Sequence, residues 1–499
     1  MYGEEKSDSL IVAANLANNP QGAESVERRS GAKGNAEQPH MRRTQSRESM
    51  SQRLSRVREA AKQRKKERFT ALFHLLTAEA LENAFLSLSR KAAAGVDGVR
   101  WKDYAENLKV NIADLHRRLH QGSYRAQPGR RHYIPKADGK QRPLGIASLE
   151  DKIVQYALVK ILNAVYENDF MGFSYGFRPG RSQHNALDAL ATGLVRTNVN
   201  WVLDADISQF FDKVSHEWLI RFIEHRIGDQ RVIRLIRKWL TAGTSEEGEW
   251  RASEEGTPQG AVISPLLANI YLHYVFDLWA HQWRRRHATG NVVMVRYADD
   301  IVIGFDKRID AQCFRIAMQR RLKEFGLTVH PKKTRLMEFG RFAAENRASR
   351  GKGKPETFNF LGFTHISGKD RSGRFMLIRK TRRDRMTATL KAIKDGLRKR
   401  WHYSIPEQGK WLRRVVQGYL NYHSVPGNYP MMRKFRIYVT DLWRRALRRR
   451  SQQDDTTWTK ANRLAAVWLP KVRVLHPWPV ERVTARHPRQ RSEEHTSEL

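Results

Sequence analysis

The sequence contains almost no cysteine, and it also lacks long apolar segments. Its one cysteine is Cys313, so neither a disulfide framework nor a zinc site made of several thiolates can form within the chain. There is no run of about 18 or more apolar residues and no recognisable signal-peptide core. These absences argue against a helical membrane span and against export. They predict a protein of the reducing cytoplasm.

Acidic residues are scarce relative to basic ones. The 499 residues include 91 Lys and Arg but only 52 Asp and Glu, which gives a formal net charge of +39. A chain with such an excess generally meets a polyanion, because each phosphate that a cation neutralises releases condensed counterions. The composition therefore favours a nucleic-acid-binding protein over a basic protein whose charge only maintains solubility.

Changes in composition divide the chain into four segments. Residues 1–65 are basic and polar, and we expect them to form a largely disordered extension in which the charged segment from Met50 to about Arg68 is helical, either solvated or in contact with RNA phosphates. Residues 66–370 alternate amphipathic helical stripes with short strand-like runs, which predicts an α+β fold with an antiparallel sheet. Residues 371–490 have a helical, strongly basic character. Residues 491–499 (RSEEHTSEL) look like a translated sequencing adaptor and are interpreted as a scar.

Carboxylates end two of the strand-like runs in the α+β segment. If the first run is a strand, Asp204 and Asp206 share one of its faces. Asp299 and Asp300 lie at the tip of a hairpin predicted from the apolar runs on either side of them, although this turn lacks the usual Gly or Asn. A further strand is expected at 358–363.

Grouping these acids requires compensation. Two unit charges about 4 Å apart repel by about 4 kcal/mol at an effective dielectric constant near 20. Mg²⁺ resolves the conflict, because it binds carboxylate and phosphate oxygens. Two such ions would activate a primer 3′-hydroxyl and stabilise a pyrophosphate leaving group. The residues alone leave open the alternative that each acidic pair belongs to a solvated turn.

Further blocks of sequence accompany these acids. The segment Tyr297-Ala298-Asp299-Asp300 resembles the YADD box of reverse transcriptases, and Asp206 matches the first aspartate of their palm. The other blocks are Ala94–Gly98, Tyr133–Lys136, Arg142–Ile146, Tyr175–Ser182, Thr257–Gly260 with Ser264–Leu267, Lys333–Thr334 and Phe360–Phe363. In this order the blocks resemble those of bacterial group II intron-encoded reverse transcriptase/maturases, over roughly residues 66–480. The resemblance implies a right-hand polymerase with fingers and an antiparallel palm sheet in 66–370. It also implies an α-helical thumb and maturase region (domain X) in 371–490.

The same resemblance assigns a role to several site residues. Asp206, Asp299 and Asp300 would hold two Mg²⁺ ions, or Mn²⁺ in their place, with the Ile207 carbonyl as a further ligand.

Four more residues would contact the nucleotide. Lys136 and Arg142 would contact the incoming triphosphate, and a surface salt bridge is the alternative for each. Phe211 would exclude a ribose 2′-hydroxyl, with Phe210 packed in the core. Gln259 would lie beneath the nascent base pair, unless it only stabilises its turn.

The helical segment is expected to bind RNA. Between Met376 and Arg450 there are 21 Lys and Arg against four acids, and aromatic residues lie between them. Basic side chains bind phosphate, while aromatic rings stack on bases or fill a helical core. The candidate RNA contacts are Arg382, Arg383, Lys391, Arg398, Arg413 and Arg414.

The resemblance implies an enzyme that binds its host group II intron RNA, assists splicing and copies the intron into DNA. Its partners would be the intron RNA, an RNA template with a DNA primer, dNTPs and a DNA target site, in a bacterial cytoplasm near the nucleoid. The alternatives are an RNA-binding splicing factor with a vestigial polymerase and a retron-type reverse transcriptase. The chain lacks the paired cysteines of the HNH nuclease found in many relatives, so we expect no nuclease. The sequence indicates no oligomeric state.

Overall fold

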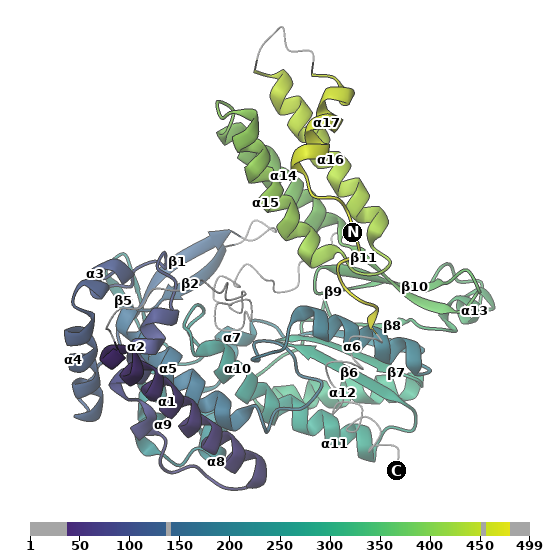
Figure 1. Ribbon diagram of the computed structural model, residues 1–499. Coiled ribbons are helices and arrows are strands. Elements are labelled where there is room, and N and C mark those ends of the chain that lie inside the picture. Colours follow the sequence, from purple (N-terminus) through teal and green to yellow (C-terminus); the bar gives the residue numbers. More distant parts are fainter. Residues whose placement is uncertain (1–36, 136–140, 451–455, 480–499) are drawn as a thin grey trace.

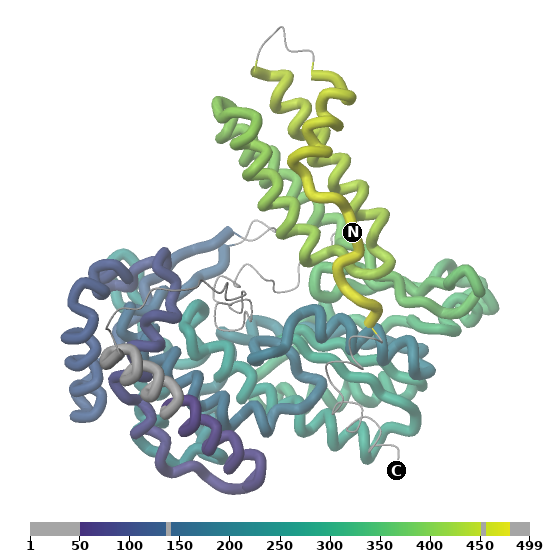
Figure 2. Tube along the Cα trace, in the orientation of Figure 1, coloured from purple at the N-terminus to yellow at the C-terminus, as the bar shows by residue number. Residues whose placement is uncertain are grey.

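The structure is a computed structural model, and it describes residues 37–135, 141–450 and 456–479. Figure 1 shows two α/β regions side by side, with a helical arm rising above them. In Figure 2 the trace runs from the purple helices of the first region to the yellow end of the arm, which descends again toward the second region. Within the described ranges, no helix is long and apolar enough to cross a bilayer.

The second region contains a four-stranded antiparallel sheet, here called the central sheet, with strand order β6-β7-β3-β8. Its strands are β3 (Trp201–Asp206), β6 (Val292–Tyr297), β7 (Asp300–Phe305) and β8 (Arg335–Glu338). Successive side chains of a strand point to opposite faces, so Leu203 and Ala205 enter one buried cluster while Val202 enters another. Both faces are covered, which explains why these strands are almost continuously apolar.

The first region contains a mixed sheet with strand order β2-β1-β4-β5. Its strands are β1 (Gly129–Pro135), β2 (Gln141–Ile146), β4 (Thr244–Glu246) and β5 (Glu249–Arg251). Strand β1 is antiparallel to β2 and parallel to β4. The expected α+β class with antiparallel sheets is therefore confirmed, with one parallel pairing in addition.

Helices cover these sheets and begin at recognisable capping residues. Ser148 starts α5 by accepting a hydrogen bond from the Asp151 amide, and Ser182 and Asn185 form a reciprocal capping box at the start of α6. The helices before the arm are α1 (Glu37–Gln63), η2 (Phe73–Leu75), α2 (Ala78–Ser87), α3 (Trp101–Glu106), α4 (Leu108–His120), α5 (Leu149–Tyr166), α6 (Gln183–Arg196), α7 (Phe210–Lys213), α8 (His216–Arg226), α9 (Gln230–Thr241), α10 (Ser264–Leu272), the π-helix η3 (His273–Asp277), α11 (Leu278–Arg286), α12 (Arg308–Glu324) and α13 (Ala343–Ala348).

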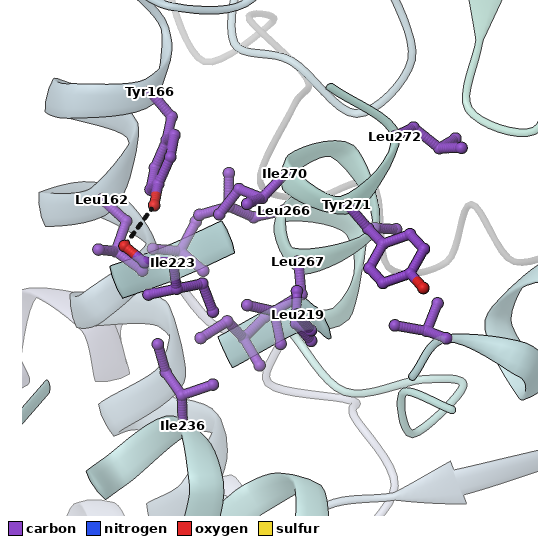
Figure 3. Packing of buried hydrophobic residues seen from close by; sticks show 14 of the residues in the cluster. Leu162, Tyr166, Leu219, Ile223, Ile236, Leu266, Leu267, Ile270, Tyr271 and Leu272 are labelled. Atoms are coloured by element: carbon purple, nitrogen blue, oxygen red, sulfur yellow. Dashed lines mark hydrogen bonds between the residues drawn. The ribbon is translucent and has the colours of Figure 1, made fainter. Parts of the chain in front are cut away.

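The largest core joins both regions. Figure 3 shows side chains of α5, α8, α9 and α10 interlocking around Ile223, with the Tyr166 hydroxyl donating to the Ile223 carbonyl at 3.4 Å. Leu162, Ile223 and Ile270 are fully buried, and each such side chain contributes about 1.5–3 kcal/mol of transfer free energy. The same core includes Leu203, Ile301 and Ile303, so it joins these helices to the central sheet.

The helix expected from Met50 is present, but it already begins at Glu37, where disorder was expected, and it is packed instead of solvated. Helix α1 continues to Gln63, and Met50, Leu54 and Val57 pack against the main core while Ala61 is fully buried. The spacing of these apolar residues, i, i+4, i+7 and i+11, is that of one helix face. The many charged residues between them hid this face in the sequence.

A three-stranded antiparallel sheet precedes the arm, with order β11-β10-β9. Its strands are β9 (Phe358–Phe360), β10 (Phe363–Lys369) and β11 (Phe375–Thr381). The single strand expected at 358–363 is interrupted at Leu361 and Gly362, which both have positive φ values, 43° and 77°. The expected boundary between 370 and 371 falls between β10 and β11 of this one sheet.

The helical arm begins at Arg383 and has its own apolar core. Its helices are α14 (Arg383–Lys399), α15 (Ile405–His423), α16 (Tyr429–Arg448) and α17 (Trp458–Trp468). Ser404 and Glu407 form a capping box at the start of α15. Buried residues such as Leu412, Phe435 and Trp443 form a cluster separate from the two clusters of the base. The residues at 491–499 that were interpreted as a scar lie outside the described residues.

Candidate active site

The hairpin between β6 and β7 ends in a two-residue turn of Ala298 and Asp299. Tyr297 and Asp300 are register partners on either side of it. Ala298 has a φ of 55°, in the left-handed region that short hairpin turns require and that non-glycine residues adopt at some cost. The predicted hairpin is confirmed, and its turn closes without Gly or Asn.

The turn lies beside the end of β3. Asp206 is the register partner of Asp300, and residues directly opposite in an antiparallel pair project from the same face. Asp206, Asp299 and Asp300 are 3%, 6% and 3% exposed. The fold thus brings the three predicted carboxylates together at one end of the central sheet, in a largely desolvated place. Asp204, also buried, lies two residues earlier on the Asp206 face.

A basic loop compensates part of this negative charge. The Lys333 ammonium lies 3.3 Å from Oδ2 of Asp206. The loop's backbone follows the end of β3, because the His330 amide donates to the Asp206 carbonyl at 2.8 Å and the Ser208 amide donates to the Thr328 carbonyl at 2.8 Å. Ile207 lies between these contacts with its side chain buried in the core, and its role as a metal ligand stays a prediction.

The donor set fits a hard divalent cation, although it is not a closed cage. Within the ranges described, no group of three or more His, Cys, Asp or Glu side chains is arranged to hold a metal by itself. Mg²⁺ does not require such a cage, because it usually keeps several waters and binds one or two carboxylates together with substrate phosphates. Asp206 already attracts the Lys333 cation, so this end of the sheet favours positive charge.

Aromatic side chains border the carboxylates. Phe211 is half-buried and its ring meets that of Phe177 edge-on at 6.4 Å, whereas Phe210 is only 2% exposed and packs in the core. The packed position predicted for Phe210 agrees with the structure, and the sugar gate at Phe211 stays a prediction. Phe177 belongs to the Tyr175–Ser182 block, but sequence reasoning assigned it no role. Its φ of 58° is unusual for a bulky residue, and its ring lies 6.3 Å from that of Tyr297.

The other predicted nucleotide contacts lie on the side of the first region. The Gln259 amide nitrogen donates to Oδ1 of Asp212 at 2.6 Å, and the Gln259 carbonyl accepts from the Gly145 amide at 2.7 Å. Gln259 therefore ties α7 to strand β2. Arg142 is partly buried on β2 opposite Ile134. Lys136 lies outside the described residues.

The predicted RNA contacts divide into exposed and buried residues. Arg382 is 4% exposed, and its guanidinium donates to the Asp384 carboxylate at 2.6 and 3.1 Å. This placement favours a structural role at the base of the arm over direct RNA contact. The exposed candidates on α14 and α15 are Arg383, Lys391, Arg398, Arg413 and Arg414.

A buried ion pair behind the turn was not anticipated. Arg296, on β6, and Asp277, at the end of η3, are both 0% exposed and approach to 2.6 Å. Nearby, burial lowers the pKa of His273 to about 4, and burial raises the pKa of the Tyr297 hydroxyl to about 12. Both groups are therefore neutral near pH 7, and the charges behind the site are those of Arg296 and Asp277.

Comparison with known proteins agrees with this geometry. Residues 134–365 match the family described as reverse transcriptase (RNA-dependent DNA polymerase). Protein YkfC of Escherichia coli K12 is 43% identical over 206 residues, which are 40% of this chain and 54% of that protein. The group II intron-encoded protein LtrA of Lactococcus lactis is 37% identical over 223 residues, 44% of this chain and 37% of LtrA.

A longer match reaches an intron protein of yeast. The putative COX1/OXI3 intron 1 protein of Saccharomyces cerevisiae is 26% identical over 393 residues, 65% of this chain and 46% of that protein. The chain thus spans about half or less of the length of the curated relatives it matches. The three carboxylates, the hairpin turn and the Lys333 loop all fall within the matched range, so the chain carries a reverse transcriptase domain. Its relatives include a group II intron-encoded protein and an intron maturase.

Proposed function

We propose that this chain is an RNA-directed DNA polymerase that binds its host group II intron RNA, assists its splicing and copies it into DNA. The observation that carries the proposal is the pairing of Asp206 with Asp300, next to Asp299, at one end of the central sheet of a reverse transcriptase domain. In this proposal the central sheet is the palm, the first region the fingers and the arm the thumb.

The chain's own residues would prepare the reaction. Asp206, Asp299, Asp300 and the Ile207 carbonyl would hold two Mg²⁺ ions, or Mn²⁺ in their place. When bound, the metal ions supply Lewis-acid stabilisation to the primer 3′-oxygen and to the pyrophosphate leaving group. Lys333 keeps the charge of Asp206 compensated at 3.3 Å. The apolar clusters on both faces of the sheet exclude water from behind the carboxylates.

Residues around the carboxylates would select the nucleotide. Arg142 and Lys136 would contact the triphosphate, and Gln259, fixed between Asp212 and Gly145, would lie beneath the new base pair. Phe211 would lie against C2′ of the sugar, where a ribose hydroxyl would collide with its ring.

The arm would hold the RNA. Arg383, Lys391, Arg398, Arg413 and Arg414 are exposed on helices whose apolar faces are already used in the arm's own core. Exposed cations on a rigid helical scaffold suit a phosphate backbone, and such contacts position RNA without reading its sequence. The intron relatives favour group II intron RNA over a general RNA template.

Replacing Asp299 with alanine tests the proposal. We expect Asp299→Ala to lower Mg²⁺-dependent DNA synthesis on a primed RNA template by at least about 100-fold, while RNA affinity is retained. Asp306→Ala is the matched control, because Asp306 follows the opposite end of β7 and carries the same charge. Synthesis by Asp299→Ala at the wild-type rate would refute the metal assignment. Absence of synthesis from the wild-type protein, with splicing assistance intact, would favour the vestigial-polymerase alternative.

A further inference from the structure

The guanidinium of Arg296 makes hydrogen bonds with all of its donors. Nε and Nη2 donate to the two oxygens of Asp277 at 2.7 and 2.6 Å. The remaining bonds go to the Asn269 side-chain oxygen at 3.1 Å, the Ala298 carbonyl at 3.0 Å and the Ser174 hydroxyl at 2.7 Å. Five N–H groups are thus matched by five acceptors, which is the full capacity of an arginine. One acceptor, the Ala298 carbonyl, belongs to the turn that carries Asp299.

Two of the residues that accept these hydrogen bonds, Asn269 and Asp277, belong to consecutive helices. Asn269 is on α10 and Asp277 ends the π-helix η3, which joins α10 to α11. A π-helical turn changes the direction of the side chains that follow it and recurs at functional sites. Here the Asp277 carboxylate, at the end of η3, accepts hydrogen bonds from Arg296. Because Arg296 also donates to the Ala298 carbonyl, it connects η3 to the turn.

Gly176 supports the same turn from another side. A Cβ at Gly176 would lie 2.3 Å from the Ala298 amide nitrogen and 2.9 Å from the Tyr297 carbonyl carbon. The Asn269 amide nitrogen donates to the Gly176 carbonyl at 2.7 Å, so one side chain fixes both Gly176 and Arg296. The chain before Gly176 also pairs with β6, since the Tyr175 amide donates to the Arg296 carbonyl at 2.8 Å.

Stability alone does not explain a charge pair in this position. A buried ion pair loses hydration that its mutual attraction repays only in part, and well-packed apolar replacements often fold as well or better. What an apolar pair lacks is a directed hydrogen bond to the Ala298 carbonyl. The turn has a positive φ at Ala298, and such a conformation persists only where its surroundings define it.

We infer that Asp277, Arg296 and Asn269 are positioning residues that hold the Ala298–Asp299 turn, and with it two of the metal-binding carboxylates, in the geometry needed for nucleotidyl transfer. The inference rests on the proposed function, because it assigns these residues to the polymerase site. A displacement of about 1 Å at a reacting centre lowers rates by up to about 100-fold, so the effect of the network appears in kcat.

The test replaces the ion pair by apolar side chains in the double variant Asp277→Leu/Arg296→Met. We expect kcat for DNA synthesis to fall roughly 10- to 100-fold, while template–primer affinity and Tm remain close to wild type. The matched control is Asp169→Leu/Arg226→Met. That pair is also buried, with 11% and 2% of the side chains exposed, but Arg226 donates to the Arg64 and Glu67 carbonyls, away from the turn. The control variant should keep the wild-type kcat.

A second measurement does not depend on polymerisation. Fe²⁺ bound in place of Mg²⁺, with ascorbate and hydrogen peroxide, cleaves a polypeptide beside its binding site. We expect cleavage next to residues 299 and 300 in the wild-type protein and in the control variant, and weaker or displaced cleavage in Asp277→Leu/Arg296→Met. Gly176→Ala disturbs the turn from the other side and should give the same pattern, which keeps the test decisive if the double variant does not fold.

The outcomes separate the inference from the proposed function. Wild-type kcat and wild-type Fe²⁺ cleavage in a folded double variant, or in Gly176→Ala, would overturn the positioning role while leaving the polymerase proposal intact. A wild-type protein that cleaves at residues 299 and 300 but makes no DNA would refute the proposed function. The cleavage pattern of the variants would still decide whether the network sets the turn.

Discussion

The central sheet and the helical arm use charge in different ways. Around the turn of the sheet, Arg296 and Asp277 are fully buried, and Asp206 keeps an ion pair with Lys333. In the arm, side chains such as Arg413 and Arg414 are exposed on helices that pack through apolar faces. Burial fixes a charge to one partner, whereas exposure leaves it available to a ligand. A substitution among the buried charges of the sheet should therefore change the geometry of the turn. In the arm, the losses of RNA affinity caused by separate substitutions should add up.

The largest effect that follows from this contrast concerns RNA affinity. Replacing Lys391, Arg398, Arg413 and Arg414 by glutamine should weaken intron RNA binding roughly 100-fold or more at moderate salt. It should also reduce the slope of log affinity against log salt by about one for each phosphate that the variant no longer neutralises. Filter binding over a salt series measures both quantities.

The control for this variant removes the same charge from two helices of the second region, outside the arm. The exposed residues for that purpose are Arg285, Arg286, Arg320 and Lys323, on α11 and α12. If RNA affinity drops equally in the two variants, net charge determines RNA binding and the arm has no special part in it. That result would contradict the contrast between sheet and arm.

The same contrast explains what the sequence predicts and what it does not. Asp206, Asp299 and Asp300 are detectable because each interrupts an apolar run at a strand end, and the strand pairing then brings them together. The exposed cations of the arm are detectable from composition. In both cases the signal is local in the sequence.

The supporting network has no local signal. Ser174 and Arg296 are 122 positions apart, and Asp277 resembles any acid of an amphipathic helix. Gly176 is one glycine among 32, and its role depends on a close approach to Ala298 that only the folded chain creates. Helix α1 is an intermediate case, since its apolar face has regular spacing but lies within a heavily charged segment.

A smaller effect distinguishes two adjacent rings at the end of the sheet. Phe211→Ala should lower discrimination against ribonucleotides roughly 10-fold, because a hydroxyl then fits where the ring was. Phe210→Ala should leave discrimination unchanged and lower the free energy of unfolding by about 3–5 kcal/mol, because Phe210 is 2% exposed. Single-nucleotide incorporation and urea unfolding measure the two effects. Reversal of the two outcomes would place the gate at Phe210.

The smallest effect is the pH dependence of stability that comes from one buried histidine in each region, and here sheet and arm should behave alike. Burial lowers the pKa of His273, beside the central sheet, and of His423, in the arm, to about 4 in each case. A histidine whose folded pKa lies below its unfolded value near 6.5 is held neutral by folding. Its contribution to stability is complete above that value and is lost as the pH falls from about 6.5 toward 4.

As the pH falls from 7 to 5.5, each histidine should therefore lower the free energy of unfolding by about 1 kcal/mol. His423→Gln and His273→Gln should each remove that share of the pH dependence, which urea unfolding at the two pH values measures. The control His402→Gln removes an imidazole that is exposed between α14 and α15, so it separates the effect of burial from the loss of any histidine. If only one of the two variants loses pH dependence, the location of a buried histidine, and not its burial, determines its effect on stability. If both lose the same share, sheet and arm treat buried titratable groups alike. The contrast between them then concerns only the charges that face a ligand.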